Sequence, residues 1–197
     1  MTEKSNQEET VQDSRSIQDK WSFRIQPASK SYDYGVSSSA DQPRYSGINS
    51  PTQLTAAIEN LFSSQYLSVL STQNQGAPYG NLVAFASADS LTRLIFVTPK
   101  ATRKFSNIVS EPRVAMVIDN RSNNNIDFSS AIAVTATGRA QESTPPQRAR
   151  FLEIFLAKHP HLKEFAESPS CAVISIDVET YYCVYRFQNV MELHLNK

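Results

Sequence analysis

Residues 96–118, FVTPKATRKFSNIVSEPRVAMVI, say more about the fold than any other part of the sequence. This stretch begins with Phe96–Thr98, an apolar and β-branched run that is typical of a strand. A short helical pattern follows from the N-cap residue Thr102, and Pro112 stops it. Val114–Ile118 then has the composition of a buried strand. The stretch therefore predicts a strand, a short loop, a helix and a second strand in immediate succession.

The flanking sequence extends this pattern in both directions and predicts a mainly β fold with inserted helices. Ser50–Gln53 is a capping box that opens a helix, and Thr144–Gln147 opens another that runs to about Lys158. Strands this close in sequence need no parallel crossovers, so we expect a closed antiparallel barrel. The other predicted strands are Tyr66–Thr72, Pro78–Ser87, Arg93–Thr98, Ile132–Ala140, Cys171–Val178 and Tyr181–Phe187, with turns at Gln73–Ala77 and Asp89-Ser90.

The first 49 residues differ in composition from the rest and predict a polar, flexible tail ahead of one domain at 50–197. They are rich in Ser, Gln and Asp, so they cannot bury much apolar surface on their own. Trp21, Phe23 and Ile25 alternate along the chain, so this part could also lie across a partner surface as a short extended piece.

The charge balance and the cysteines narrow the class of protein. Lys+Arg and Asp+Glu both number 19, so no general attraction to nucleic acid or to an anionic membrane is expected. Cys171 and Cys183 lack metal-ligand spacing and suit a reducing compartment. The polar start of the chain and the lack of an apolar run near the ~20 residues of a membrane helix predict a soluble cytoplasmic protein.

One cluster of basic residues has the features of an anion-binding site. Arg103 and Lys104 fall in the first turn of the helix that Thr102 caps, and Lys100 stands just ahead of them. The N-terminus of a helix carries about half a positive charge, so cations there are unfavourable unless an anion binds between them. A phosphate fits the free N–H groups, the hydroxyl and the cations together. The alternative is a solvated basic turn without a ligand.

Three stretches together resemble the FMN-binding core of the pyridoxamine-phosphate-oxidase-like superfamily. They are GAPYGNLVAF at 76–85, LIFVTPKATRKFSNIVSEPRVAMVI at 94–118 and GRAQ at 138–141, and the resemblance spans about 58–142. It implies a split antiparallel β-barrel of the FMN-binding type, bound FMN, and a homodimer with the cofactor between its subunits. The flavin would carry out the hydride or electron transfer, and the protein would bind and orient it.

The resemblance also implies roles for individual residues. Arg103 and Lys104 align with the Arg-Lys pair that holds the FMN phosphate, and Thr102 would add its hydroxyl. The loop at Asn123–Asn125 could reach the cofactor of the other subunit. The complete set of predicted cofactor-binding residues is Asn81, Leu82, Val83 and Ala84 along the isoalloxazine ring, Val97 and Thr98 at the ribityl–phosphate portion, and Lys100, Thr102, Arg103 and Lys104 at the phosphate.

The sequence departs from the oxidase proper at its substrate site. Basic residues of the oxidase are replaced by Asn81 and Ala86, a Gln near Ala133 is missing, and 171–197 lacks the oxidase's Trp and Arg-x-His. We therefore predict an FMN-dependent oxidoreductase for an unidentified small molecule, with unknown catalytic residues, and not a true pyridoxamine-phosphate oxidase. Alternatives are a deazaflavin-dependent reductase or a non-catalytic flavin or haem carrier.

The histidines predict no metal site. His159 and His161 lie at a helix end without a cysteine or carboxylate at ligand spacing, and they are expected on the surface, where they interact favourably with the helix dipole. His194 lies in an alternating run, MELHL, that predicts an edge strand. Its functional alternative is a haem ligand, because a haem-utilising branch of the superfamily uses a C-terminal histidine.

Overall fold

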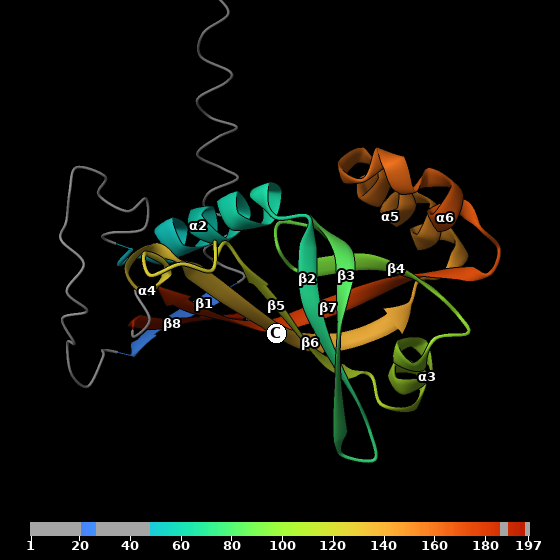
Figure 1. The fold of residues 1–197 in the computed structure, drawn as a ribbon, viewed down its shortest axis with the longest axis horizontal. Coiled ribbons are helices and arrows are strands. Elements are labelled where there is room, and N and C mark those ends of the chain that lie inside the picture. The colour runs from blue at the N-terminus through green and yellow to red at the C-terminus, as the bar shows by residue number, and fades with distance from the viewer. Residues whose placement is uncertain (1–20, 27–47, 186–188, 196–197) are drawn as a thin grey trace, which may run out of the picture.

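The computed structural model describes residues 21–26, 48–185 and 189–195, which form one antiparallel sheet with helices around it (Figure 1). In chain order the elements are β1 (Trp21–Gln26), α2 (Pro51–Ser64), β2 (Leu67–Asn74), β3 (Ala77–Ala88), β4 (Arg93–Pro99), α3 (Arg103–Ser110), β5 (Arg113–Asp119), α4 (Asp127–Ser130), β6 (Ile132–Glu142), α5 (Pro145–Lys158), the 3-10 turn Pro160–Leu162, α6 (Lys163–Glu167), β7 (Cys171–Tyr185) and β8 (Asn189–Leu195).

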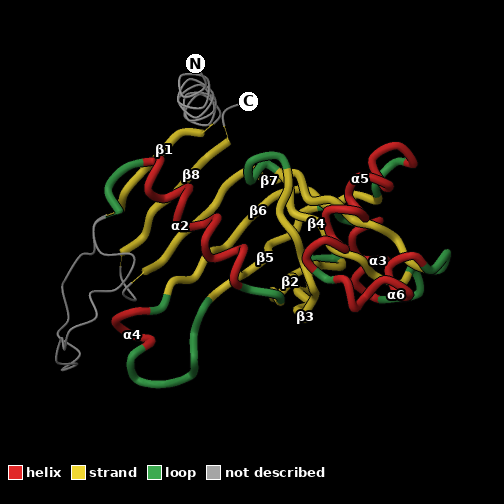
Figure 2. The backbone as a smooth tube through the Cα atoms, turned by 90° about the horizontal axis from the view of Figure 1, so that it is seen from above, coloured by secondary structure: helices red, strands yellow, loops and turns green. Residues whose placement is uncertain are grey.

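Six strands close into a barrel, which confirms the predicted split-barrel fold. The strand order is β1-β8-β7-β4-β3-β2-β5-β6, and β6 also pairs with β7, so the ring from β7 to β6 is closed. The 15-residue β7 makes this possible, since its first half pairs with β4, its second half with β8 and nearly its whole length with β6. The sequence predicted two strands where β7 is continuous. Strands β8 and β1 extend the sheet beyond the barrel (Figure 2).

The barrel is split between β3 and β4. Residues Ala77–Ala84 of β3 pair with β2, whereas only Phe85–Ala88 pair with β4. Within the described residues, the other edge of Ala77–Ala84 therefore has no strand partner. Helix α3 follows directly after β4, so the open part of β3 and the start of α3 belong to the same end of the barrel.

Two apolar clusters hold the domain together. The larger fills the barrel and is covered by α2, with Phe62, Phe85 and Tyr181 among its fully buried side chains. The smaller lies between α5, α6 and the outer face of β3 and β4 (Figure 1). Small side chains at Ala84, Ala86 and Ala88 let Phe151 and Phe155 of α5 pack against this face.

Local chemistry explains where the helices and turns begin. The Ser50 hydroxyl accepts from Gln53 N at 3.3 Å, and Gln53 Oε1 accepts from Asn49 N rather than from Ser50 N, at 2.9 Å. At the second predicted capping box, Gln147 Oε1 accepts from both N and Oγ1 of Thr144, at 3.4 and 3.0 Å. Both helix starts are thus confirmed. The turn between β2 and β3 has φ of 50° at Gln75 and 83° at Gly76.

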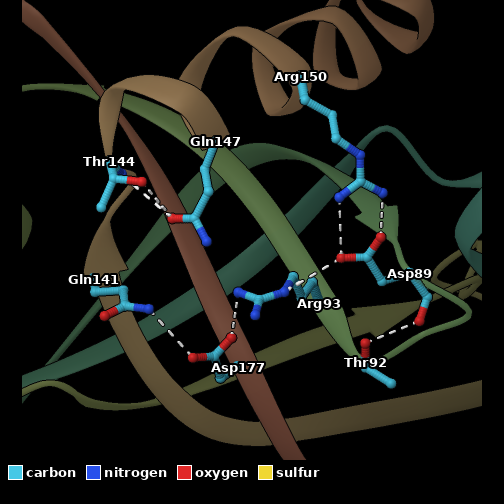
Figure 3. Close-up of polar contacts among 8 residues, drawn as sticks. All are labelled: Asp89, Thr92, Arg93, Gln141, Thr144, Gln147, Arg150 and Asp177. Carbon is cyan, nitrogen blue, oxygen red and sulfur yellow. Dashed lines mark hydrogen bonds and ion pairs between the residues drawn. The ribbon is translucent and has the colours of Figure 1, made fainter.

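A cluster of ion pairs and hydrogen bonds connects α5 to the barrel at the β3–β4 turn (Figure 3). Arg150 of α5 forms an ion pair with Asp89 of the β3–β4 turn, and Asp89 also lies 3.3 Å from Nε of Arg93. Arg93 pairs in turn with Asp177 of β7, which accepts from the Gln141 amide at 3.3 Å. The two arginines lie over the same ring, that of Phe151.

The N-terminal segment contributes more to the fold than the sequence predicted. Trp21–Gln26 form β1, which pairs antiparallel with Val190–Leu195, and Ile48 is buried in the larger cluster. The flexible-tail alternative did not include this strand, whereas the alternative of an extended piece at Trp21, Phe23 and Ile25 agrees with its conformation. Residues 1–20 and 27–47 lie outside the described residues. Cys171 and Cys183 are buried free thiols. None of the helices in the described ranges has the length and apolar character that crossing a bilayer requires.

Candidate functional site

The site begins where β4 ends and the chain turns into α3. Thr98 is fully buried, and its Oγ1 lies 3.1 Å from Oγ1 of Thr102. The Thr102 hydroxyl donates to Pro99 O at 2.9 Å and accepts from Phe105 N at 3.4 Å, so the predicted N-cap is confirmed. The Lys100 N–H donates to Ser170 O at 2.9 Å, which ties the loop to the chain just before β7.

Two cations occupy the first turn of α3, and that turn contains no acidic residue. Arg103 is exposed, and its guanidinium carbon lies 5.2 Å from the ring centroid of Tyr79 on β3. Lys104 is half-buried. Neither residue forms a salt bridge within the described part of the chain. Lys100 differs, because its Nζ lies 2.6 Å from Glu142 Oε1, which neutralises it locally.

The predicted residues of β3 divide between its two faces. Leu82 is 66% exposed and Ala84 packs towards α5, whereas Val83 points into the barrel. Asn81 shares the inner face with Val83 and Tyr79 because side chains alternate along a strand. Both polar atoms of the Asn81 amide are buried, and neither has a hydrogen-bond partner within the described residues.

The structure thus brings together most, but not all, of the predicted side chains. Thr98, Thr102, Arg103 and Lys104 share the β4–α3 junction, and Asn81 lies on the β3 face whose Tyr79 contacts Arg103. The Val97 side chain belongs to the cluster under α5, so only its backbone remains for a ligand at the Thr98 side.

Sequence reasoning missed three residues of this region. Asn107 of α3 is 3% exposed, and its Nδ2 donates to Thr72 Oγ1 at 2.9 Å. The Thr72 hydroxyl in turn donates to Tyr79 O at 3.4 Å. The signal for Tyr79 was its alternation with Asn81, and the signal for Asn107 was its spacing of four from Arg103. Neither spacing reveals the partner on the other element.

The histidines of the described residues do not gather into a metal-binding or catalytic cluster. His159 is buried, contrary to the predicted surface position, and its Nε2 lies 2.8 Å from Phe85 O. Burial lowers the pKa of His159 below its ordinary value. His194 has both ring nitrogens engaged, Nδ1 at 3.1 Å from Thr180 Oγ1 and Nε2 at 2.8 Å from Glu192 Oε2. Within the described residues, no cluster of His, Cys, Asp and Glu could hold a metal ion.

Comparison with solved structures supports the fold. A haem-binding protein from Mycobacterium smegmatis superimposes with a TM-score of 0.59 at 15% identity, over 66% of this chain and 53% of that protein. The chain therefore corresponds to about half the length of this relative. General Stress Protein 26 from Bacillus anthracis gives 0.52 at 21%, over 66% and 93% of the two chains. A FAD-binding protein from Mesorhizobium loti gives 0.50 at 18%, over 70% and 92%.

The sequence itself identifies the family. A search of curated proteins found no significant match. Residues 54–185 match the family described as pyridoxamine 5'-phosphate oxidase, which covers the barrel from α2 to the end of β7. The chain therefore belongs to the pyridoxamine 5'-phosphate oxidase family.

Proposed function

We propose that the chain binds FMN, with the phosphate at the start of α3, and that it works as an oxidoreductase on a small molecule. The observation that carries the proposal is the pair Arg103 and Lys104 in the first turn of a helix, without ion-pair partners in the described residues. Cations at this place repel the helix dipole, by a few tenths of a kcal/mol to about 1 kcal/mol each. A bound phosphate reverses this penalty because it attracts both the cations and the free N–H groups.

The neighbouring part of β3 fits the rest of the cofactor. The open edge of Ala77–Ala84 offers backbone N–H and C=O groups, and the Asn81 amide offers a buried donor and acceptor that have no hydrogen-bond partner among the described residues. Buried polar groups are nearly always hydrogen-bonded, so this amide favours a polar ligand at the site. A flat ring with carbonyl and N–H groups along its edge matches such a surface. Bound flavin supplies hydride or electron transfer, for which the protein provides orientation and exclusion of water.

The arrangement around Ala86 supports a substrate other than pyridoxamine phosphate. Ala86 stands where the sequence resemblance places a basic residue of the oxidase, and it is 2% exposed beneath Phe151 and Phe155 of α5. A charged side chain there would be desolvated in an apolar cluster, which is strongly unfavourable. The position therefore cannot supply a cation for a second phosphate.

We also propose that the protein is a homodimer and is located in the cytoplasm. Leu67 and Leu82 are 55% and 66% exposed and lie diagonally across the β2–β3 ladder, next to the exposed Tyr66. A second copy of the chain would cover this apolar patch, with an interface above ~2,000 Å² as in stable homodimers. The buried free thiols Cys171 and Cys183 suit a reducing compartment.

The test of the phosphate site is a titration of FMN and of riboflavin, which lacks the phosphate. Arg103→Ala with Lys104→Ala should weaken FMN binding, because each charge-assisted contact contributes about 1.5–3 kcal/mol. Its affinity for riboflavin should stay the same. Arg148→Ala with Lys163→Ala removes two cations from α5 and α6 and is the matched control. Equal FMN affinity in the two double variants would contradict the proposal.

A further inference from the structure

We infer that Tyr79 is a positioning residue that holds the Arg103 guanidinium ready for an anion, and that the β2–β3 hairpin thereby sets the preference for a phosphorylated ligand. This inference rests on the proposed function of the site. It starts from the contact between the Arg103 guanidinium carbon and the Tyr79 ring, at 5.2 Å from the centroid. That distance lies within the range of cation–π interactions.

The strand fixes where the Tyr79 ring points. Tyr79 pairs with Thr72 across the β2–β3 ladder, three residues from the turn at Gln75-Gly76. Its side chain shares a face with Asn81 and is half-buried. An aromatic side chain has only two rotatable bonds, so a half-buried ring on a paired strand is a rigid platform for a longer, flexible side chain.

A second contact locks the hairpin to the same helix. Asn107 follows Arg103 by four residues, so the two side chains lie on one face of α3. Asn107 Nδ2 donates to Thr72 Oγ1 at 2.9 Å in a buried environment, and Thr72 is the residue paired with Tyr79. The Thr72 hydroxyl also reaches Tyr79 O at 3.4 Å. Helix and hairpin are thus joined at two points one helical turn apart.

The contact between Arg103 and Tyr79 reduces the conformational entropy that is lost when an anion binds. An exposed arginine has many rotamers, and fixing them opposes binding. Stacking on Tyr79 restricts the Arg103 guanidinium before a ligand arrives, and its planar fork can still offer N–H groups at its edge. Lys104 has no such contact within the described residues. The structure therefore assigns the directional part of anion recognition to Arg103 together with the Tyr79 ring on which it stacks.

The experiment compares FMN and riboflavin affinities of the wild type, Tyr79→Leu and Tyr79→Phe. Loss of a cation–π contact at an exposed site should weaken FMN binding two- to fivefold in Tyr79→Leu. Riboflavin affinity should be unchanged, and Tyr79→Phe, which keeps the ring, should retain the wild-type ratio of the two affinities. In an Arg103→Ala background, Tyr79→Leu should have no further effect on FMN.

Three results would overturn the inference. An unchanged FMN affinity in Tyr79→Leu would show that the ring does not prepare the guanidinium. A tighter FMN complex would show that the ring holds Arg103 away from the ligand. An equal loss for FMN and riboflavin would assign Tyr79 to the flavin ring or to the fold. Wild-type protein that binds no FMN would overturn the proposed function as well, so the two failures are distinguishable.

Discussion

A single methyl group at Gly138 should destabilise the barrel strongly. Gly138 lies in β6 at the irregularity where the register with β7 shifts, and it is buried. A Cβ on Gly138 would overlap the Asp177 carbonyl oxygen and would lie 3.0 Å from Val178 Cα. Asp177 is paired with Arg93 of β4, and Val178 N donates to Thr92 O at 3.0 Å, so this part of β7 is held from its other side as well.

The size of the effect follows from this geometry. Overpacking a core costs about 1–3 kcal/mol, and more when backbone atoms have to move, so we expect at least about 3 kcal/mol for Gly138→Ala. For a domain of this size, about 1 kcal/mol lowers the Tm by roughly 2–4 °C, so the Tm should fall by about 6–12 °C. Gly80→Ala is the matched control, because a Cβ there would meet only Val69 Cγ1, at 3.9 Å.

Thermal and urea unfolding followed by circular dichroism measure the difference. Both variants lose the same glycine freedom in the unfolded chain, which by itself stabilises by about 0.4–1 kcal/mol. Their difference therefore isolates the clash. If Gly138→Ala unfolded at the same temperature as Gly80→Ala, the close approach of β6 and β7 would be refuted.

Three further predictions concern the helix cap at Thr102, the half-buried amine of Lys158 and the substrate. Thr102→Ala should lower the free energy of unfolding by about 0.5–2 kcal/mol in urea titrations, because α3 loses its N-cap; no change would argue against the cap. Burial lowers the pKa of Lys158 to about 8. In the unfolded chain Lys158 keeps its proton up to about pH 10.5. Between about pH 8 and 10.5 the unfolded state therefore binds more protons than the folded state, and the free energy of unfolding should rise with pH in this range. Lys158→Met should lessen that rise. An identical pH dependence of the free energy of unfolding in the variant and the wild type would contradict the prediction. With pyridoxamine phosphate and saturating FMN, oxygen consumption should be negligible because Ala86 supplies no cation; turnover at an oxidase's rate would refute this.

Local signals predicted much of the fold because they depend on neighbouring residues alone. The helix caps at Ser50, Thr102 and Thr144 need only a hydroxyl ahead of a helical pattern, and all three begin helices in the structure. The turn at Gln75-Gly76 needs residues that tolerate positive φ. Such features could be read from the sequence without knowledge of any distant partner.

Features that depend on tertiary contacts were predicted incorrectly or not at all. The sequence predicted separate strands at Cys171–Val178 and Tyr181–Phe187, but pairing with β6 on both sides of Glu179 keeps β7 continuous. In α3 the apolar Val109 is 71% exposed, whereas the polar Asn107 is buried. The hydrogen bond from Asn107 to Thr72, 35 residues away in sequence, explains the difference.

At the site too, the features that depend on neighbouring residues were predicted and those that depend on tertiary contacts were not. Arg103 and Lys104 were found because cations in a first helical turn are locally unfavourable. Pairing of Lys100 with Glu142 and stacking of Arg103 on Tyr79 join elements that are distant in sequence. Predicting them needs the register of β3 and the place where β6 ends, which no local pattern specifies.

We propose that the protein carries FMN at the start of α3 and that it does so as a homodimer. Native mass spectrometry of the protein as isolated, with an absorption spectrum of the same sample, tests it most directly. We predict the mass of two chains with FMN bound, the absorption bands of a flavin, and loss of the bound FMN in Arg103→Ala with Lys104→Ala. A haem or deazaflavin spectrum, or a monomer that takes up no FMN when FMN is added in excess, would show that the protein is not an FMN-binding homodimer.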